Sequence, residues 1–301
     1  MNTAERRFKK KTKLNRLKAF DYINYTVLIL FSVICLYPFW YVLIGSFNEG
    51  LDYVKGGVFF WPREITSANY VVIFSDNRLW TGLIITSFRT AIGTITALLF
   101  TAMVAYAMSR KKLKGRKIIY NLNLFTMFVG GGIIPYYLVI NAIGLYDTFA
   151  VYIIPGLYSV YNMIIIQNFF KGIPEELHES CMLDGAGELR IFFLIYMPLS
   201  KPVLATVALW IAVGHWNSFF ETMMFTSKTE LQTLQYYLLK VIKESSYVTS
   251  GVMLPAQAIE KLSPETVSFA AIVVSVIPMV AVYPFVMKFF QSGILIGSLK
   301  G

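Results

Sequence analysis

Six long apolar stretches constrain this chain more than any other feature of its sequence. A helix needs about 20 apolar residues to cross the hydrocarbon layer of a membrane. The chain is 56% hydrophobic and only 15% charged, an apolar excess that a water-soluble domain does not require. We therefore predict an all-α, polytopic membrane protein with six transmembrane helices. These occupy residues 25–46, 81–108, 118–141, 149–170, 200–224 and 267–290.

The distribution of Lys and Arg predicts the orientation of these helices. If the N-terminus is cytoplasmic, the segments on the inside hold 19 of the 27 Lys and Arg and those on the outside hold 7. Arg89 lies within the second span. The positive-inside rule therefore places both termini in the cytoplasm. The formal charge of +10 follows from this topology, and we expect no nucleic-acid partner, because the basic residues flank apolar runs.

The chain divides into four parts. Residues 1–20 form a basic N-terminal segment, and residues 21–80 hold the first transmembrane helix and an outer loop. Residues 81–290 form the core, and residues 291–301 form a cytoplasmic tail. The first apolar stretch, Tyr25–Ser46, exceeds the roughly 7–15 residues of a signal-peptide core. We therefore interpret it as an uncleaved span.

Between the fourth and fifth spans, residues 171–198 form an acidic cytoplasmic loop. Pro174 suits the first position of a helix, where its missing N–H costs nothing. Glu175 and Glu176 follow in the first turn, where the helix dipole favours negative charge. Asp184 and Gly185 end this helix after about ten residues, as helix-stopping residues do. The pattern predicts a short, rigid helix that protrudes from the membrane and docks on a partner.

A second, apolar helix is expected from Ala186 to Met197, along the membrane face. Asp184 is able to cap its N-terminus, and Pro198 ends it. The alternative role of Asp184, a direct contact with the partner, stays open.

This loop resembles the coupling motif of ABC importer permeases, which reads Glu-Ala-Ala, three residues, Gly, nine residues, Ile-x-Leu-Pro. Four residues match at the required spacing: Glu179, Gly185, Ile195 and Pro198. Ser180 and Cys181 stand where the family has alanines, and Met197 stands in the Leu position. The flanking residues are similar to the carbohydrate-uptake branch, whose members resemble the maltose permease G subunit.

The resemblance implies a type I ABC importer permease bundle in the bacterial cell membrane. Such a chain is not an enzyme. It pairs with a second permease subunit, two ATPase subunits and an external solute-binding protein, and together they import a sugar or oligosaccharide. ATP and Mg belong to the partner ATPase, and no cofactor or metal is expected on this chain.

Family analogy assigns the ATPase-coupling role to seven residues: Leu177, Glu179, Ser180, Cys181, Met182, Asp184 and Gly185. Glu179 is expected to pair with a basic residue of the ATPase. Gly185 is expected to turn the chain through a positive φ. Leu177 and Met182 pack either into the ATPase groove or against the second helix of the loop, and the sequence leaves both open.

Candidates for the translocation path are the polar and aromatic residues at membrane depth: Asn123, Tyr161, Asn162, His215, Trp216, Asn217 and Glu221. The alternative is structural, since aromatic residues gather at membrane interfaces and asparagines join helices. Arg89 is a functional candidate as an intramembrane charge. Residues 225–266 are expected to meet the binding protein, and Ser298–Gly301 the ATPase interface.

Three other functions explain the sequence less well. An ion-coupled transporter would need carboxylates within the spans, and Glu221 is the single candidate. A membrane enzyme would need a catalytic constellation, but the chain holds only His178 and His215, with neither metal-ligand spacing nor a nucleophile motif. A scaffold protein would not require the coupling pattern.

Overall fold

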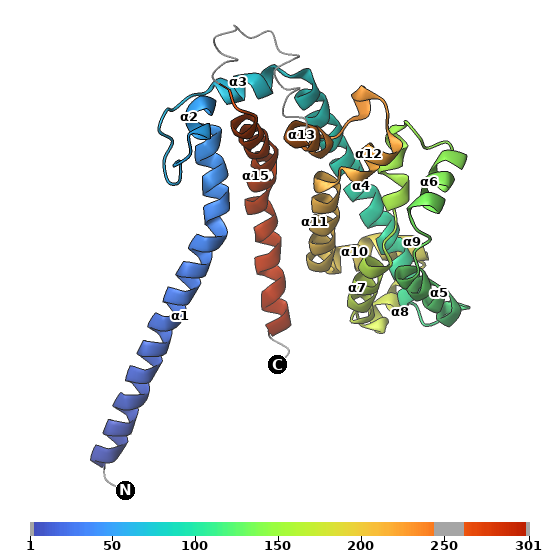
Figure 1. Cartoon of the computed structure of the whole chain (residues 1–301). Helices are drawn as coiled ribbons and strands as arrows, with labels where there is room; N and C mark the ends of the chain where they lie inside the picture. The colour runs from blue at the N-terminus through green and yellow to red at the C-terminus, as the bar shows by residue number, and fades with distance from the viewer. Residues whose placement is uncertain (1–2, 244–261, 299–301) are drawn as a thin grey trace. The chain divides into compact units, whose positions relative to one another are not determined.

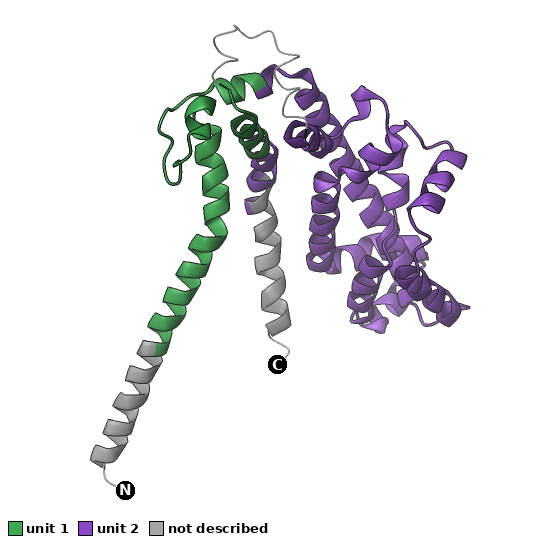
Figure 2. Cartoon of the chain, in the orientation of Figure 1, with its two compact units in different colours: residues 1–72, 253–273 green, residues 73–252, 274–301 purple. Residues whose placement is uncertain are grey.

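A computed structural model describes residues 3–243 and 262–298, with side chains for residues 20–243 and 262–281 and for Pro284. These residues form helices joined by loops, and the predicted all-α class is confirmed. The chain forms two compact units (Figure 2): one holds residues 1–72 and 253–273, the other residues 73–252 and 274–301.

The first unit is built on α1 (Thr3–Ser46), α2 (Gly50–Val54), the start of α3 (Ala68–Ser75) and the start of α15 (Pro264–Ser298). Its elements meet at the buried side chain of Asn69. The Asn69 amide donates to the carbonyls of Ser46, at 2.9 Å, and Asn48, at 3.0 Å. Its oxygen accepts from the Thr266 hydroxyl at 3.0 Å. Asn69 thereby satisfies carbonyls that the end of α1 leaves without helical partners.

The second unit is built around α4 (Asn77–Ser109). Its buried face carries small residues at helical spacing: Gly82, Thr86, Gly93, Ala97, Thr101 and Ala105. Small residues let neighbouring helix backbones approach closely. Accordingly α7 (Val160–Lys171), α11 (Lys201–Asn217) and α13 (Leu234–Lys243) all pack against α4 (Figure 1).

The apolar stretches form helices, but only some of these stretches form a single straight helix. Among the described residues, three helical segments are long and apolar enough to span a membrane: Phe20–Ser46, Asn77–Ser109 and Pro264–Ala281. Three further spans are bent pairs, which brings the total to six if each pair counts as one span. The pair α5 (Arg116–Phe128) and α6 (Ile133–Ala142) bends by 115°. Gly132, with φ +84°, lies at this break.

The predicted fifth span, residues 200–224, is interrupted. Helix α11 ends at Asn217, and the short α12 (Phe220–Phe225) follows after Ser218. On its other side, α11 joins the segment Glu188–Leu199 at an angle of 86°. The fourth span is likewise bent by 49°, between the 3₁₀ turns η1 (Phe149–Tyr152) and η2 (Ile154–Gly156) and helix α7.

The second helix of the 171–198 loop differs from the prediction. It begins with α9 (Glu188–Ile191), continues as the π-helix η3 (Phe192–Tyr196) and ends with α10 (Met197–Leu199). Pro198 therefore does not end the helix. The π turn ends two residues before Pro198, whose missing N–H interrupts the α-helical hydrogen-bond ladder.

An aspartate joins the loop after α6 to the loop after α12. One oxygen of Asp147 accepts from the backbone N–H groups of Ser227, at 2.6 Å, and Lys228, at 3.0 Å, and the other pairs with the Ser227 hydroxyl. The hydrogen bond from Ser227 lowers the pKa of Asp147. Asp147 has a φ of +57°, which aspartate tolerates better than most residues. Beyond this loop lie the 3₁₀ turn η4 (Thr229–Leu231) and α13.

Candidate functional site

The predicted coupling helix is present as α8 (Glu175–Leu183). Pro174 precedes it in an extended conformation (φ −55°, ψ 134°), so it occupies the capping position and not the first helical position. This places the start one residue later than predicted. The same preference explains both placements, because Pro supplies no N–H where a helix start has no acceptor for one.

Helix α8 ends in a left-handed turn at Gly185, as expected. The φ of Gly185 is +79°. Its N–H donates to the Met182 carbonyl at 3.1 Å, and the N–H of Ala186 donates to the Cys181 carbonyl at 2.9 Å. This pattern resembles a Schellman termination. Asp184 is the last residue of this cap, and the cap of α9 is Gly187, so Asp184 does not cap the second helix as predicted.

Most of the predicted coupling residues lie on the surface of α8 and its terminal turn. Those exposed are Leu177, Glu179, Ser180, Met182, Asp184 and Gly185. Cys181 is partly buried against the core of the second unit. The sequence reasoning missed Leu183, whose side chain is 89% exposed. An apolar residue so open to solvent on a short protruding helix is the signal that distinguishes it.

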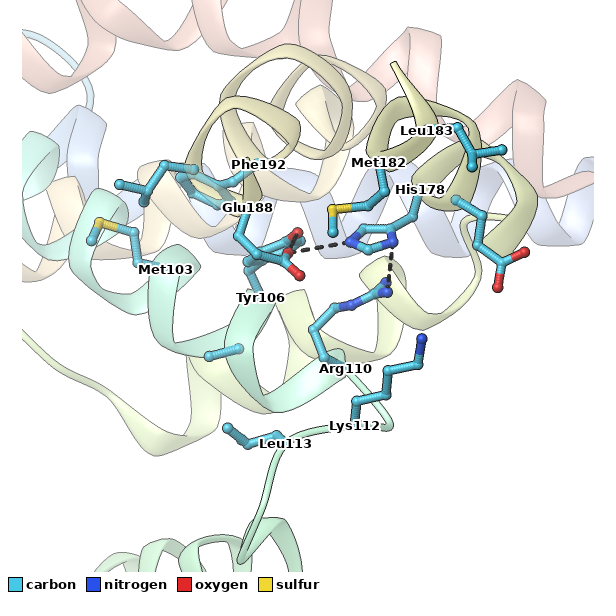
Figure 3. Close-up of a pocket in the computed structure, with 13 residues that line it drawn as sticks. Met103, Tyr106, Arg110, Lys112, Leu113, His178, Met182, Leu183, Glu188 and Phe192 are labelled. Carbon is cyan, nitrogen blue, oxygen red and sulfur yellow. Dashed lines mark hydrogen bonds and ion pairs between the residues drawn. The ribbon is translucent and has the colours of Figure 1, made fainter. Parts of the chain in front are cut away.

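The inner face of α8 is attached to α4 through His178, which the sequence reasoning also missed. His178 is buried, and its Nδ1 lies 2.8 Å from Nη2 of Arg110, directly after α4 (Figure 3). Arginine has only donors, so Nδ1 accepts and Nε2 carries the hydrogen. That Nε2 lies 3.2 Å from a carboxylate oxygen of Glu188, at the start of α9. His178 thus bridges three helices.

Two tyrosines extend this network into the core. The Tyr106 hydroxyl donates to the Glu188 carboxylate, and Arg110 donates to the Tyr196 hydroxyl at 2.9 Å. The rings of Tyr106 and Tyr196 touch, with centroids 4.7 Å apart. We call Tyr106, Arg110, His178, Glu188 and Tyr196 the α8 network. It connects an exposed helix to the longest helix of the second unit without a flexible linker.

A cavity of about 790 Å³ opens beside the α8 network. From the predicted coupling set, Met182 (Figure 3) and Glu179 contribute to its wall. The remaining wall is largely apolar and includes Met103, Leu113, Leu183, Leu189 and Phe192. Among the described residues, no group of three or more His, Cys, Asp or Glu is arranged to hold a metal ion.

A surface ion pair links the loop after α4 to the first turn of α8. Nζ of Lys111 lies 2.9 Å from a Glu175 carboxylate oxygen. The hydrogen bond from Lys111 lowers the pKa of Glu175. The Lys111 side chain is 80% exposed, so this pair contributes little to stability. It shows that the basic loop and α8 share one end of the second unit.

Two of the predicted path residues, His215 and Glu221, meet around Arg89. Arg89 is 2% exposed, and its Nη2 lies 2.8 Å from a Glu221 carboxylate oxygen. Nε of Arg89 donates to Nδ1 of His215 at 3.4 Å, and Nη1 donates to the Ser218 carbonyl at 3.3 Å. Arg89 therefore satisfies a carbonyl where α11 breaks, and its charge is balanced.

Arg89 also lies over the ring of Tyr152, 4.8 Å from its centroid. His215 packs against Gly93 so closely that a Cβ there would lie 2.5 Å from its Nε2. The ion pair thus sits in a closely packed joint between α4 and the end of α11.

The other predicted path residues have contacts of their own. Asn123 accepts a hydrogen bond from Tyr158, and Tyr161 packs against Trp210 with ring centroids 6.2 Å apart. Nε1 of Trp216 donates to the Ser275 carbonyl at 3.4 Å. Asn217 is exposed, and the backbone N–H of Asn162 donates to Ser159 at the start of α7. Of the seven, His215 and Glu221 share the cluster around Arg89.

The predicted receptor loop, residues 225–266, is described only in part. Helix α13 packs on α4, and the N–H of Leu234 donates to the Thr86 hydroxyl at 2.9 Å. Residues 244–261 lie outside the described residues, as do residues 299–301 of the predicted ATPase-contacting tail.

Comparison with known proteins places these features in a family. Residues 12–296 match the model of "Binding-protein-dependent transport system inner membrane component". Protein LplC of Bacillus subtilis is 38% identical over 292 residues, which cover 96% of this chain and 97% of LplC. The polygalacturonan/rhamnogalacturonan transport system permease protein YtcP of the same organism is 36% identical, with 95% of this chain and 99% of YtcP covered.

A solved structure is similar over nearly the whole fold. It is a crystal structure of a bacterial ABC transporter involved in the import of the acidic polysaccharide alginate. One of its chains matches with a TM-score of 0.81 and 33% identity, covering 91% of this chain and 97% of that chain.

Proposed function

Because this chain belongs to the family of binding-protein-dependent transport system inner membrane components, we propose that it forms half of the translocation path of an ATP-driven oligosaccharide importer. A companion permease supplies the other half. Two ATPase subunits drive the cycle, and an external binding protein delivers the sugar. The chain itself performs no chemistry, and ATP and Mg bind to the ATPase.

The observation that carries this proposal is the exposed helix α8 held to α4 by the α8 network. A helix that transmits force must not slide over its support. His178 is buried and contacts Arg110 at 2.8 Å and Glu188 at 3.2 Å. A displacement of α8 by a closing ATPase is therefore passed to α4, the helix on which α7, α11 and α13 pack.

The proposed orientation has both termini in the cytoplasm. Its support within the second unit is that α8 and the basic loop 110–117 meet through Lys111 and Glu175. The loop that holds Asp147 and the loop that holds Ser227 also lie together. Each pair belongs to segments that the positive-inside rule assigns to the same side.

The substrate class follows from the relatives. One relative is named for polygalacturonan and rhamnogalacturonan transport, and the similar crystal structure is that of an alginate importer. We infer that this chain passes an oligosaccharide. The paired charges of Arg89 and Glu221 favour a structural role for this cluster over direct sugar binding, because both charges already have partners.

Charge reversal on α8 tests the coupling proposal. The complex, with its companion permease, ATPase and binding protein, is purified with Glu179→Lys and reconstituted into liposomes. We expect loss of ATPase co-purification or of ATP-driven uptake. Glu64→Lys is the matched control, because Glu64 is also exposed and lies between α2 and α3, outside both α8 and residues 225–266. Unchanged assembly and uptake in Glu179→Lys contradict the docking role.

The substrate class is tested on the purified binding protein, against a panel of neutral and uronic-acid oligosaccharides. Calorimetric titration should find a sugar that also stimulates ATP hydrolysis by the reconstituted complex. A panel in which every sugar fails, while an amino acid or peptide stimulates hydrolysis, contradicts the carbohydrate assignment.

A further inference from the structure

The loop between α2 and α3 turns back along α1 and carries three exposed aromatic residues at its tip. Phe59, Phe60 and Trp61 are 57%, 67% and 72% exposed. We call residues 56–62 the aromatic loop. Gly56 and Gly57, with φ of +76° and +83°, reverse the chain direction just before the tip, a conformation that L side chains rarely adopt. Figure 1 shows the loop beside the upper part of α1.

The indole N–H of Trp40 and the hydroxyl of Tyr37, both on α1, form hydrogen bonds with the backbone of the aromatic loop. Nε1 of Trp40 donates to the Phe60 carbonyl at 3.0 Å, and the Tyr37 hydroxyl donates to the Phe59 carbonyl at 3.5 Å. The Trp61 ring packs edge-on against Trp40, with centroids 5.5 Å apart. Backbone carbonyls near lipid need such partners, because no water replaces them there. The contacts explain how an irregular segment is able to lie against an apolar helix.

The position of these contacts along α1 gives the depth of the loop. Trp40 lies six residues before Ser46, which corresponds to about 9 Å along the helix axis. The apolar segment Phe20–Ser46 has 27 residues and is about 40 Å long. A hydrocarbon core is about 30 Å thick, so each end extends roughly 5 Å beyond it if the helix is centred. Trp40 and the loop tip then lie about 4 Å inside the boundary between hydrocarbon and headgroups.

The base of the loop is polar, in contrast to its tip. Arg63 donates from Nε to Asp52 at 3.0 Å and from its backbone N–H to Asn48 at 2.8 Å. These residues lie just beyond the end of α1. The loop thus has charge at the level of water and aromatic rings deeper, which is the distribution of interfacial residues in membrane proteins.

We propose that the aromatic loop inserts into the lipid interface beside α1 and anchors the first unit to the leaflet at the α2 end of that helix. In the proposed orientation this is the outer leaflet. The occupant of the surface is lipid, because the loop carries charge at its base and exposed aromatic rings at its tip, the order of residues across a membrane interface. Only 6% of the apolar window of α1 is buried within the chain.

Site-directed fluorescence quenching tests this anchor in the full complex in nanodiscs. Trp61→Cys is labelled with bimane in a Cys35→Ser, Cys181→Ala background, in which residue 181 becomes the alanine of the family motif, and uptake is compared with that of the unlabelled background. Ile65→Cys is the matched control, because Ile65 is 79% exposed and lies at the base of the same loop. The label at 61 should be quenched several-fold more by shallow spin-labelled lipid than by iodide. The label at 65 should show the reverse.

Two outcomes overturn the proposal. Quenching at position 61 by iodide, to the extent seen at position 65, means that the loop tip is in water. Protection from both quenchers means that a partner protein covers it. Sugar uptake by the same labelled complex is measured in parallel. If the loop tip is not in lipid but uptake is intact, the anchor proposal fails and the importer proposal stands. If the loop tip is in lipid but no sugar is taken up, the anchor proposal stands and the importer proposal fails.

Discussion

His178 and Arg110 lie 2.8 Å apart, and this contact joins the inner face of α8 to the end of α4. Neither residue belongs to the coupling pattern, yet in the proposed mechanism their contact passes motion of α8 to α4. The exposed face of α8 and its buried anchor are therefore separable by mutation.

We expect His178→Ala to lower uptake per ATP hydrolysed by roughly five- to a hundredfold. Loss of a buried hydrogen-bonded group costs about 1–3 kcal/mol, and 1.4 kcal/mol corresponds to a factor of ten. The measurement compares sugar uptake and ATP hydrolysis in the same proteoliposomes. His178→Asn should retain more coupling, because an amide is able to accept from Arg110. Equal losses of uptake and hydrolysis, with normal assembly, would argue against a role in transmission.

A methyl group at Gly93 should disrupt the joint between α4 and α11. The added Cβ would lie 2.5 Å from Nε2 of His215, and overpacking of this kind costs about 1–3 kcal/mol. Thermal unfolding in detergent should show a lower midpoint for Gly93→Ala. The control is Gly214→Ala on α11, where no atom lies within 4 Å of the new Cβ. There the higher helix propensity of Ala should leave the midpoint unchanged or raise it.

The Arg89–Glu221 pair should show strong thermodynamic coupling. Each single substitution leaves a largely buried charge without its partner. A double-mutant cycle of Arg89→Met and Glu221→Gln, followed by denaturant titration in micelles, should give about 1–3 kcal/mol. The exposed pair Lys111–Glu175 serves for comparison and should give less than about 1 kcal/mol. Similar values for the two pairs would show that burial adds nothing at Arg89.

The Asp147 contacts should depend on pH only in acid. The pKa of Asp147 is lowered in the folded protein by its hydrogen bond with Ser227. Its contribution is therefore complete above the usual value of about 3.9 and is lost as the pH falls through the lower, folded value. Hydrogen exchange at the amides of Ser227 and Lys228, corrected for intrinsic rate, should be constant from about pH 8 to 5 and rise below about pH 4.

Substitution of Asp147 should reproduce the acid effect at neutral pH. Asp147→Ala removes the acceptor. It also places alanine, whose side chain forms no local hydrogen bond, at a φ of +57°. Exchange at both amides should then be fast at every pH. Asp147→Asn keeps one acceptor oxygen and should remain partly protected. A wild-type profile that changes near neutral pH would require a different titrating group.

The sequence predicted local features well where one short-range rule dominates. The start of α8 was misplaced by a single residue at Pro174, and the positive φ of Gly185 was confirmed. Predictions that depended on competition between neighbours were wrong. Asp184 is the C-cap of α8, and Gly187 is the N-cap of α9. The second helix contains a π turn and continues past Pro198. Hydrogen bonds that form only in the folded loop decide which residue caps a helix and whether a proline ends it.

By itself the sequence determined the apolar segments, their charge asymmetry and the short acidic helix between two of them, because hydrophobic transfer and helix capping act over a few neighbouring residues. Only the tertiary structure decided which polar residues meet. Arg89 and Glu221 are 132 positions apart, and Arg110 and His178 are 68 apart. No local pattern specifies such pairs, since they arise from the packing of small residues on α4, which brings distant helices close enough for buried charges to be paired.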